Sequence, residues 1–460
     1  MMIFKNKKST LIYPPDVKPY PFQERLILRM LQDKSPNIYN ACTMGLGKTV
    51  QAYIYMNTIE AKNLLVLCPS GLKLNWLTEG KRWFVHNHNP TAILNRKNFT
   101  DLLEKPKNYR PSPFIVSYQM LVRNADLMRY ILHREWDGCI SDEVDDVRNI
   151  DAKSTRLSAE IWDAVGKNMF LSGTPMPNGA IDLFPTLAQI VPGLTYISRR
   201  DVKLCTNFYK FAEKFTYIKT DRHGVHYRGI RNHEHLRKIL HNKTQKFYFR
   251  RTIDQVIKDL PKMTMNIVEL DLKTESVDKS KFEKEFSKFK AGKFKKFEKP
   301  PIMAKIRREA GLAIAHCEDA HKFCEKILLE NEPIVIFCWH KDVVNILVQR
   351  FKKFKPVTVT GETSTKSKME AVNKFQEGET NIIIGNLIAL GKGWTLTRGR
   401  HAVFYEYDWL PKTILQAMGR LRRIGQKNAM FAHFFSCKNE FHMKIAKEVV
   451  RKQKNIRRVI

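Results

Sequence analysis

The chain lacks the segments that would place it in a membrane or on a secretory route. No apolar run in its 460 residues approaches the length that a membrane-spanning helix needs. The first ten residues contain lysines but no apolar core of a signal peptide. We therefore expect a soluble protein that acts inside the cell, in the cytoplasm.

The sequence also lacks the cysteine spacing of zinc modules and disulfide frameworks. Its eight cysteines include no CxxC pair and none with a histidine at zinc-finger spacing. They are Cys42, Cys68, Cys139, Cys205, Cys317, Cys324, Cys338 and Cys437. Several lie inside apolar runs, where cysteine behaves as a small buried hydrophobe. We expect reduced core cysteines and no structural metal.

Acidic residues are scarce relative to basic ones. The chain has 46 Asp and Glu against 80 Lys and Arg, which gives a formal net charge of +34. Such an excess repels itself unless a polyanion is the partner, so nucleic acid is the leading candidate. Generic solubility, or a source whose proteins are all rich in lysine, is the alternative that charge alone leaves open.

Short apolar runs recur along the chain with helical patterns between them, which is typical of buried parallel strands. The first set comprises Ile38–Ala41, Leu64–Cys68, Phe114–Ser117, Gly138–Ser141 and Asn168–Leu171. The second set comprises Ile334–Phe337, Val357–Thr360, Asn381–Gly385, Ala402–Tyr405 and Met430–Phe435. Two sets predict two α/β lobes.

Three other segments have a distinct character. Tyr217–Thr220 and Val225–Arg228, joined by Asp221 to Gly224, predict a β-hairpin. Leu272–Pro300 is crowded with lysine and predicts a helical connection between the lobes, whose lysines either contact phosphate or form a solvated face. Phe441–Arg458 predicts a basic amphipathic helix.

A phosphate-binding loop follows the first predicted strand. The segment from Cys42 to Thr49 reads Cys-Thr-Met-Gly-Leu-Gly-Lys-Thr and leads into a helical pattern. Glycines allow backbone N–H groups to surround phosphate oxygens, and the helix N-terminus adds positive potential. Lys48 is expected to reach the β- and γ-phosphates and Thr49 to ligate Mg²⁺. The pattern departs from a full P-loop at its first position, where Cys42 replaces glycine.

Asp142 and Glu143 follow the strand Gly138–Ser141 and are the candidate acid pair. Asp142 suits a Mg²⁺ ligand, and Glu143 suits a base that polarises the attacking water. Asp145 and Asp146 come soon after, so the alternative is a merely solvated acidic turn. The presence of a P-loop favours the catalytic interpretation.

In this order the motifs resemble those of superfamily-two helicases, and specifically of the Swi/Snf branch of DNA translocases, from about Tyr20 to about Phe435. The first half supplies Phe22-Gln23, Met44-Gly45-Leu46-Gly47-Lys48-Thr49, Cys68-Pro69-Ser70 with Trp76, Ser117-Tyr118, Asp142-Glu143, Ser172-Gly173-Thr174-Pro175 with Asn178, and Phe249-Arg250-Arg251 with Leu260-Pro261. The second half supplies His340-Lys341, Gly391-Lys392-Gly393-Trp394-Thr395-Leu396-Thr397, and Gln416 to Gln426 with Arg420 and Arg423. Asp145 replaces the usual histidine, and Gly419 stands where many relatives carry Asp.

The resemblance implies two tandem RecA-like lobes, an α/β fold with a nucleotide cleft between them and small helical and hairpin insertions. It implies lobe one at 1–195, a Swi/Snf-type insertion at 196–262, a basic helical linker at 263–300, lobe two at 301–440 and a basic helix at 441–460. It implies an ATP and Mg²⁺ site in which Gln416, Arg420 and Arg423 approach Lys48 from the other lobe. The remaining implied nucleotide contacts are Gln23, Thr43, Met44, Gly45, Leu46, Gly47 and Gly393.

The resemblance also assigns coupling and DNA contacts. They are Ser70, Ser117, Ser172, Gly173, Thr174, His340, Lys341, Thr395 and Thr397. The segments 307–313 and 337–343 resemble the fork-remodelling, strand-annealing subgroup, and the compact chain resembles bacteriophage branch-migration helicases, which generally act as monomers. The expected partner is double-stranded and branched DNA, held mainly by its phosphate backbone.

Three functions follow as hypotheses. The leading one is an ATP-dependent DNA helicase or translocase that remodels branched DNA, by branch migration, fork regression and limited unwinding, in DNA replication, repair or recombination. The second is a translocase that displaces proteins from duplex DNA without unwinding it. The third is a non-catalytic DNA-binding scaffold, which the presence of Lys48, Asp142 and Glu143 disfavours. A wedge at the branch point and simple packing are the two readings of the predicted hairpin.

Overall fold

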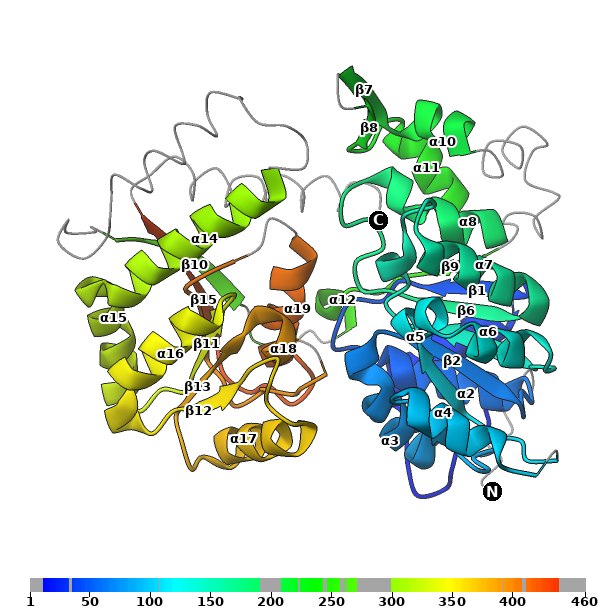
Figure 1. Ribbon diagram of the computed structural model, residues 1–460, viewed down its shortest axis with the longest axis horizontal. Coiled ribbons are helices and arrows are strands. Elements are labelled where there is room, and N and C mark those ends of the chain that lie inside the picture. Colours follow the sequence, from blue (N-terminus) through cyan, green and yellow to red (C-terminus); the bar gives the residue numbers. More distant parts are fainter. Residues whose placement is uncertain are drawn as a thin grey trace. The chain divides into compact units, whose positions relative to one another are not determined.

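The computed structural model describes residues 11–32, 35–106, 108–190, 208–221, 224–242, 246–256, 261, 263–270, 299–391, 393–407 and 411–437. These residues form two compact units. The described part up to Val256 belongs to unit 1, and the part from Met263 to Cys437 belongs to unit 2 (Figure 1). The predicted α/β class is confirmed, because each unit has an all-parallel sheet connected through helices.

Unit 1 is built on a seven-stranded sheet in the order β3-β4-β2-β5-β6-β1-β9. Its strands are β1 (Asn37–Asn40), β2 (Leu64–Cys68), β3 (Thr91–Ala92), β4 (Phe114–Ser117), β5 (Gly138–Ser141), β6 (Asn168–Leu171) and β9 (Tyr248–Phe249). A separate antiparallel hairpin is formed by β7 (Tyr217–Asp221) and β8 (Gly224–Arg228). The five predicted strands and the predicted hairpin are confirmed.

The helices of unit 1 cover both faces of this sheet (Figure 1). They are α1 (Pro21–Gln32), α2 (Lys48–Thr58), α3 (Lys73–Trp83), α4 (Arg96–Leu103), α5 (Tyr118–Arg123), α6 (Ala125–Leu132), α7 (Lys153–Val165), α8 (Phe184–Ile190), α10 (Phe208–Phe215), α11 (His233–Leu240) and α12 (Ile253–Val256). Short 3-10 turns are η1 (Ser70–Leu72), η2 (Val144–Val147) and η3 (Ala180–Leu183). Strands β2 and β4 are fully buried because helices pack on each side of the sheet, which explains why their sequences are mostly apolar.

Unit 2 has a six-stranded sheet in the order β10-β15-β14-β11-β13-β12. Its strands are β10 (Met263–Leu270), β11 (Ile334–Cys338), β12 (Val357–Val359), β13 (Ile382–Asn386), β14 (His401–Phe404) and β15 (Met430–Cys437). Its helices are α14 (Lys299–His316), α15 (Glu318–Leu329), α16 (Lys341–Arg350), α17 (Thr365–Glu377), α18 (Leu387–Leu390) and α19 (Pro411–Leu421). All five strands predicted for this half are present.

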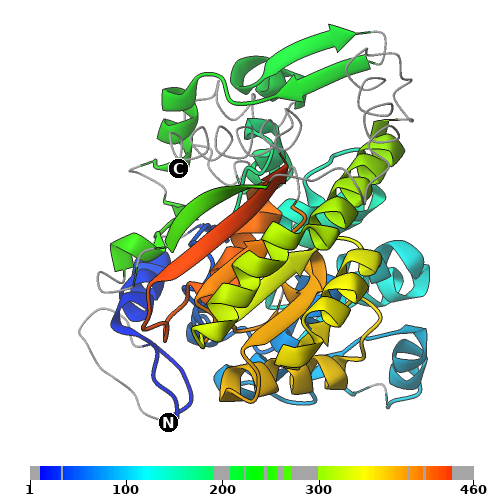
Figure 2. The same cartoon turned by 90° about the vertical axis from the view of Figure 1, so that its left-hand side faces the viewer.

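Alternate residues of β11, a central strand of the sheet, face the two helical layers of unit 2. Val335 and Phe337 pack in the core with α17, α18 and α19, whereas Ile334 and Ile336 pack with α14, α15 and α16. This period of two is what a strand buried on both faces requires. Figure 2 shows β10 beside β15 at one edge of the sheet, with α14 lying across the same sheet.

The helical linker predicted over 263–300 is wrong at its start. Its first eight residues form β10, which pairs in parallel with β15 along its whole length. Most of this strand is exposed at the sheet edge, so it lacks the continuous apolar run by which the other strands were predicted. The lysine-rich segment up to residue 298 and the predicted helix at Phe441–Arg458 lie outside the described residues.

Six of the cysteines lie in the core, as predicted. Cys42, Cys68, Cys139, Cys317, Cys324 and Cys338 are buried and form no disulfide. Burial raises the pKa of the Cys68 thiol well above its ordinary value, and it raises the pKa of Cys139 to about 12. Cys205 and the side chain of Cys437 lie outside the described residues. In the described part, no helix is long and apolar enough to cross a bilayer.

Candidate nucleotide site and its supporting motifs

The phosphate loop connects β1 to α2 in unit 1. Gly45 and Gly47 have φ angles of 86° and 70°, in the left-handed region that favours glycine. A Cβ atom on Gly47 would lie 2.3 Å from Nε2 of Gln23, so no larger residue fits this position without displacing that side chain. Lys48 begins α2, and Thr49 follows in its first turn. The predicted strand–loop–helix order is confirmed.

Two glutamines hold the loop from inside. Nε2 of Gln23 and Nε2 of Gln51 both donate to the carbonyl oxygen of Leu46, at 3.1 and 2.8 Å. Asn40 donates to Oε1 of Gln51 at 2.7 Å, and the backbone N–H of Tyr20 donates to Oε1 of Gln23 at 2.9 Å. Gln23, for which the resemblance implied adenine recognition, is therefore buried against the loop with both amide ends engaged.

The Phe249-Arg250-Arg251 motif supports the loop from the neighbouring strand. β9 pairs in parallel with β1, and beyond the ladder the backbone N–H of Thr43 donates to the carbonyl oxygen of Arg251 at 3.0 Å. A guanidinium nitrogen of Arg250 donates to the carbonyl oxygen of Ala41 at 3.0 Å. The motif thus fixes the path of the chain where it leaves β1 and enters the phosphate loop.

Asp142 and Glu143 lie at the carboxyl end of β5, and both are buried. Nε1 of Trp76 donates to Oδ2 of Asp142 at 2.9 Å, and the Tyr118 hydroxyl donates to its carbonyl oxygen at 2.8 Å. Glu143 has a φ of 47°, a left-handed conformation that is unusual for a residue with a side chain. Such strain gathers at functional sites, where the surrounding structure maintains it.

The pKa of the Asp142 carboxyl is raised to about 6, chiefly by burial and also by the neighbouring Glu143 carboxylate. The hydrogen bond from Trp76 and the charge of Lys48 act in the opposite direction. A buried carboxyl that ionises with difficulty gains much from a cation. Asp142 therefore suits a divalent metal ion, whose charge would favour the ionised form.

The Ser172-Gly173-Thr174 turn lies against the phosphate loop. A Cβ atom on Gly173 would lie 2.8 Å from Cγ of Met44 and 3.4 Å from Nζ of Lys48, so glycine permits this close approach. Nζ of Lys48 donates to the carbonyl oxygen of Cys42 at 3.0 Å. The P-loop, the acid pair and this turn are thus brought together at one edge of the sheet.

Three hydroxyl groups around this edge fit the binding of a polar ligand. The hydroxyl oxygens of Thr43, Ser117 and Thr174 are buried and have no hydrogen-bond partner within the part of the chain that the structure describes. Buried polar atoms normally find a partner, so the unsatisfied hydroxyls of Thr43, in the phosphate loop, and Thr174, in the turn against Lys48, mark a place for a ligand. The residues present therefore fit a nucleoside triphosphate with its metal ion.

Asp145, which stands where the family pattern has histidine, links the acid segment to the turn. Its Oδ1 accepts from the hydroxyl of Ser172 at 2.7 Å, and that hydroxyl oxygen accepts from the backbone N–H of Thr174 at 3.0 Å. Aspartate therefore serves as the acceptor of the Ser172 hydroxyl at this position. With aspartate in place of histidine at position 145, the acid segment and the Ser172–Thr174 turn are in direct contact.

The two serines assigned to DNA contact follow adjacent strands. Ser70 is exposed at the start of η1, just after β2, whereas Ser117 is buried at the end of β4. Cys68 and Ser117 are direct neighbours in the ladder of these two strands. Both serines therefore lie at the carboxyl edge of the sheet, and contact of either with DNA stays a prediction.

In unit 2, the arginines assigned as fingers lie at the end of α19. Nε of Arg420 donates to the carbonyl oxygen of Gly391 at 2.8 Å, and Arg423 donates to Oγ1 of Thr395 at 2.9 Å. Gln416 is buried, and its Nε2 lacks a hydrogen-bond partner among the described residues. The structure joins the last two predicted motifs in one cluster, next to Gly393. Approach of this cluster to Lys48 stays a prediction.

Thr397 forms its side-chain hydrogen bond with α17 and not with the arginine cluster. Its hydroxyl oxygen accepts from Nε2 of Gln376 on α17 at 3.3 Å. Gln376 also accepts, through Oε1, from the backbone N–H of Arg398 at 3.1 Å. Thr397 thus helps to attach its loop to α17, whereas Thr395 on the same loop is exposed and contacts Arg423.

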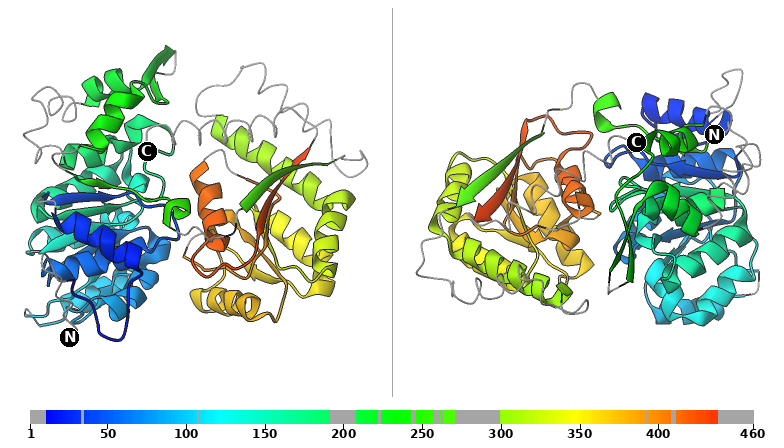
Figure 3. Two further views of the ribbon diagram at one scale, coloured as in Figure 1. Left: turned by 180° about the vertical axis from the view of Figure 1, so that it is seen from behind. Right: turned by 90° about the horizontal axis from the view of Figure 1, so that it is seen from above.

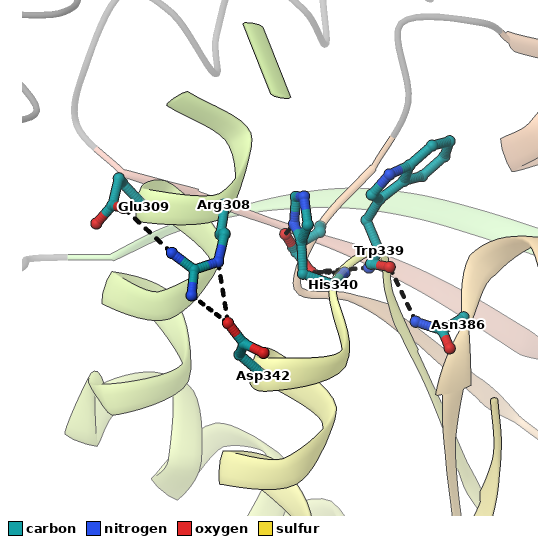
Figure 4. A network of polar contacts seen from close by, with 7 residues as sticks. Arg308, Glu309, Trp339, His340, Asp342 and Asn386 are labelled. Carbon is teal, nitrogen blue, oxygen red and sulfur yellow. Dashed lines mark hydrogen bonds and ion pairs between the residues drawn. The ribbon is translucent and has the colours of Figure 1, made fainter. Parts of the chain in front are cut away.

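His340 and Lys341 stand where β11 ends and α16 begins, and a buried glutamate fixes this turn. Oε2 of Glu406 accepts from the backbone N–H groups of Trp339 and His340, at 2.7 and 2.9 Å. Oε1 of Glu406 lies 2.6 Å from Nδ1 of His340. Figure 4 shows Asn386 reaching the same turn, where its Nδ2 donates to the carbonyl oxygen of Trp339 at 2.9 Å.

The two segments that resemble the strand-annealing subgroup, 307–313 and 337–343, pack on each other. Arg308 on α14 forms an ion pair with Asp342 on α16, as drawn in Figure 4. The Arg307 guanidinium lies 4.3 Å from the ring centre of Trp339. A Cβ atom on Gly311 would lie 2.5 Å from Cδ of Glu406. The segments 307–313 and 337–343 thus form one structural cluster next to His340.

Sequence reasoning named Trp76 and Tyr118 only as motif residues and did not name Glu406, so it missed the contacts by which these side chains position the site. Trp76 and Tyr118 contact Asp142 from 66 and 24 residues away in the chain, and Glu406 contacts His340 across 66 residues. No periodicity connects such pairs. The one available signal for Glu406 is its charge directly after an apolar strand, at the same kind of position as Asp142 after β5.

Two protein-family models match this chain. The model of the SNF2-related domain matches residues 32–315, and that of the helicase conserved C-terminal domain matches residues 319–425. A solved structure titled Sulfolobus solfataricus SWI2/SNF2 ATPase core in complex with dsDNA covers 100% of this chain with 18% identity and a TM-score of 0.41.

Curated relatives include a Caenorhabditis elegans homologue of SWI/SNF-related matrix-associated actin-dependent regulator of chromatin subfamily A-like protein 1, 25% identical, covering 91% of this chain and 58% of the relative. The mouse DNA annealing helicase and endonuclease ZRANB3 is 25% identical over 93% of this chain and 39% of the relative. The chain spans about half the length of the curated relatives it matches. Since the SNF2-related domain model matches more than half of the chain, the chain belongs to the SNF2-related family of superfamily-two helicases.

Proposed function

We propose that this chain is a DNA-stimulated ATPase that moves along DNA and remodels its branches, by branch migration, fork regression and limited unwinding. The observation that carries the proposal is the convergence of Lys48, the acid pair and the Ser172–Thr174 turn at one sheet edge. The family of the chain supports ATP hydrolysis, and its charge of +34 supports a polyanionic track.

ATP with Mg²⁺ supplies the phosphoryl group and the charge neutralisation that the reaction needs. Lys48 would hold the β- and γ-phosphates, and Thr49 with Asp142 would hold the metal ion. Glu143 would orient water and accept its proton. The residues that would complete the site are Gln416, Arg420 and Arg423, because guanidinium groups stabilise the charge that develops during transfer.

Branched DNA is proposed as the substrate for two reasons. The curated relatives include proteins named DNA annealing helicases, and the cluster formed by 307–313 and 337–343 contains the segments that resemble that subgroup. Translocation on plain duplex with displacement of bound proteins is the alternative. A likeness to bacteriophage branch-migration helicases remains part of the proposal, as does action as a monomer.

The test is ATP hydrolysis and strand exchange on a matched panel of forks, four-way junctions, plain duplex, single strands and RNA. We expect forks and junctions to stimulate hydrolysis most, and labelled strands to be exchanged. Lys48→Ala should abolish stimulated hydrolysis while most DNA binding persists, because Lys48 would bind the phosphates of ATP and not the DNA. Equal stimulation by plain duplex without strand exchange would favour the alternative, and unaltered turnover in Lys48→Ala would overturn the assigned site.

A further inference from the structure

The arm, defined as residues 208–240, extends from unit 1 and carries the hairpin of β7 and β8. Figure 1 shows this hairpin projecting from α10 and α11, away from the parallel sheet, and the view from behind in Figure 3 agrees. The arm has eight basic residues against three acidic ones. It is therefore a cationic projection whose outer strands contribute nothing to the main core of the unit.

The two faces of the hairpin differ in chemistry. The pairs Tyr217–Arg228 and Lys219–His226 share one face, because directly opposed residues point to the same side. Ile218 and Val225 lie on the opposite face and are 46% and 50% exposed. One face thus suits a phosphate backbone, and the other presents apolar groups that nothing in the described chain covers at its outer end. A nucleic-acid strand that offers phosphates and unpaired bases matches both faces.

The base of the hairpin is joined to the segment that follows the Ser172–Thr174 turn. The backbone N–H of Ala180 donates to the carbonyl oxygen of Gly229 at 3.2 Å, and Gly179 and Gly229 form a parallel β-bridge. Gly179 has a φ of 153°, and a Cβ atom there would lie 2.3 Å from the Gly229 carbonyl oxygen. Glycine is therefore required for this junction.

A continuous set of polar contacts connects this junction to the acid segment. Oδ2 of the buried Asp182 accepts from the backbone N–H of Gly179 at 3.3 Å, and its Oδ1 lies 3.5 Å from Nε of Arg148. Nη1 of Arg148 donates to the carbonyl oxygen of Asp145 at 2.7 Å. Asp145 in turn holds the Ser172 hydroxyl. These contacts link the turn that lies against Lys48 to the base of the hairpin.

We propose that the hairpin binds the separating strands at a DNA branch and that its position is set by the nucleotide site through Arg148, Asp182 and the Gly179–Gly229 junction. This inference rests on the proposed function and adds the element that meets the branch. Arg148 and Asp182 act here as positioning residues. Without the junction, the hairpin retains its surface but no longer changes position with the nucleotide.

The surface is tested with Ile218→Ser combined with Val225→Ser, since both side chains are exposed and their loss spares the core. We expect movement of a four-way junction to fall about tenfold more than duplex-stimulated hydrolysis, because contacts with unpaired bases are lost. The matched control is Leu94→Ser with Leu103→Ser, two exposed leucines elsewhere on unit 1, which should change neither rate. An equal effect of both pairs would overturn the assignment of the surface.

The link between the nucleotide site and the hairpin base is tested with Gly179→Ala and with Arg148→Gln. The Arg148 side chain is partly exposed, so its replacement should disturb folding less than a change at Gly179. Hydrogen exchange of the Tyr217–Arg228 amides is measured with and without a non-hydrolysable ATP analogue. We expect a change of at least about threefold in the unaltered chain and less than half of that change in either variant. Base pairs moved per ATP should fall in parallel.

The outcomes separate this inference from the proposed function. If the unaltered chain moves no branches, the proposed function fails. If it moves branches, and Gly179→Ala and Arg148→Gln retain both the exchange response and the number of base pairs moved per ATP, the connection alone is wrong. If the hairpin amides respond to the nucleotide but are protected from exchange by RNA or by a protein instead of by DNA, the assigned partner is wrong.

Discussion

At the residue scale, the site depends on side chains that bring buried polar groups together. Asp142 is held by Trp76 and Tyr118, Asp145 by Ser172, and His340 by Glu406. The chemistry-bearing residues could be predicted because each lies in a short local motif. Their supports could not, because a hydrogen bond between residues many positions apart leaves no local pattern in a sequence.

Asp182 makes the stability of unit 1 depend on pH. Burial raises the pKa of this carboxyl to about 6, above its value in an unfolded chain, so the folded state binds a proton more readily between about pH 4 and 6. The protonated carboxyl therefore contributes about 3 kcal/mol to the free energy of unfolding. This contribution is fully present below about pH 4 and is lost as the pH rises through 6.

The measurement is urea unfolding of the unaltered chain and of Asp182→Asn between pH 4 and 7. Asparagine does not titrate, so the stability of the unaltered chain relative to the variant should decrease as the pH rises. Taking the difference at each pH cancels the other titrating groups. A difference that is constant across the range would contradict the raised pKa.

At the scale of elements, the strands of the two main sheets were predictable where helices bury both faces. Continuous apolar runs then have no other place in the fold. The exceptions are β3 and β9, which have two residues each, and β10, which is largely exposed. These three strands owe their form to backbone pairing with a neighbour, which composition does not reveal.

The packing of α14 against the end of β14 gives a prediction at this scale. A methyl group at Gly311 would meet the Glu406 carboxyl, which is itself fixed by the turn before α16. Gly311→Ala should therefore destabilise unit 2 by about 1–3 kcal/mol, as overpacking does in cores.

The control is Gly361→Ala, where a Cβ atom meets nothing within 4 Å. It should change stability by less than about 0.5 kcal/mol. Thermal unfolding of both variants checks the difference. Equal stability of the two would mean that Glu406 moves freely, against the contacts that it makes in the structure.

At the scale of the whole molecule, the net charge of +34 predicts that affinity for the proposed DNA partner depends on salt. Each phosphate that a cation neutralises lowers the slope of log affinity against log salt by about 0.9 on duplex DNA. Replacing Lys219 and Arg228 by glutamine should therefore make the slope less steep by about 2 on a four-way junction.

The matched control replaces Lys62 and Lys167 by glutamine. Both are exposed, and they precede β2 and β6 at the amino edge of the sheet, opposite the edge with the phosphate loop. The net charge changes by the same amount, so a general effect of charge would alter both slopes alike. Binding measured by fluorescence anisotropy at several salt concentrations separates the two outcomes.

The order β6-β1-β9 has a consequence for the part of unit 1 that carries the arm. The chain leaves the sheet after β6 and returns to it at β9, and these two strands flank the one that carries the phosphate loop. The described elements between these two strands, the arm included, therefore belong to a segment whose two ends are both anchored in the same sheet. Its outer portion can therefore be shortened, lengthened or exchanged while β1, which leads into the phosphate loop, keeps both neighbours in the sheet.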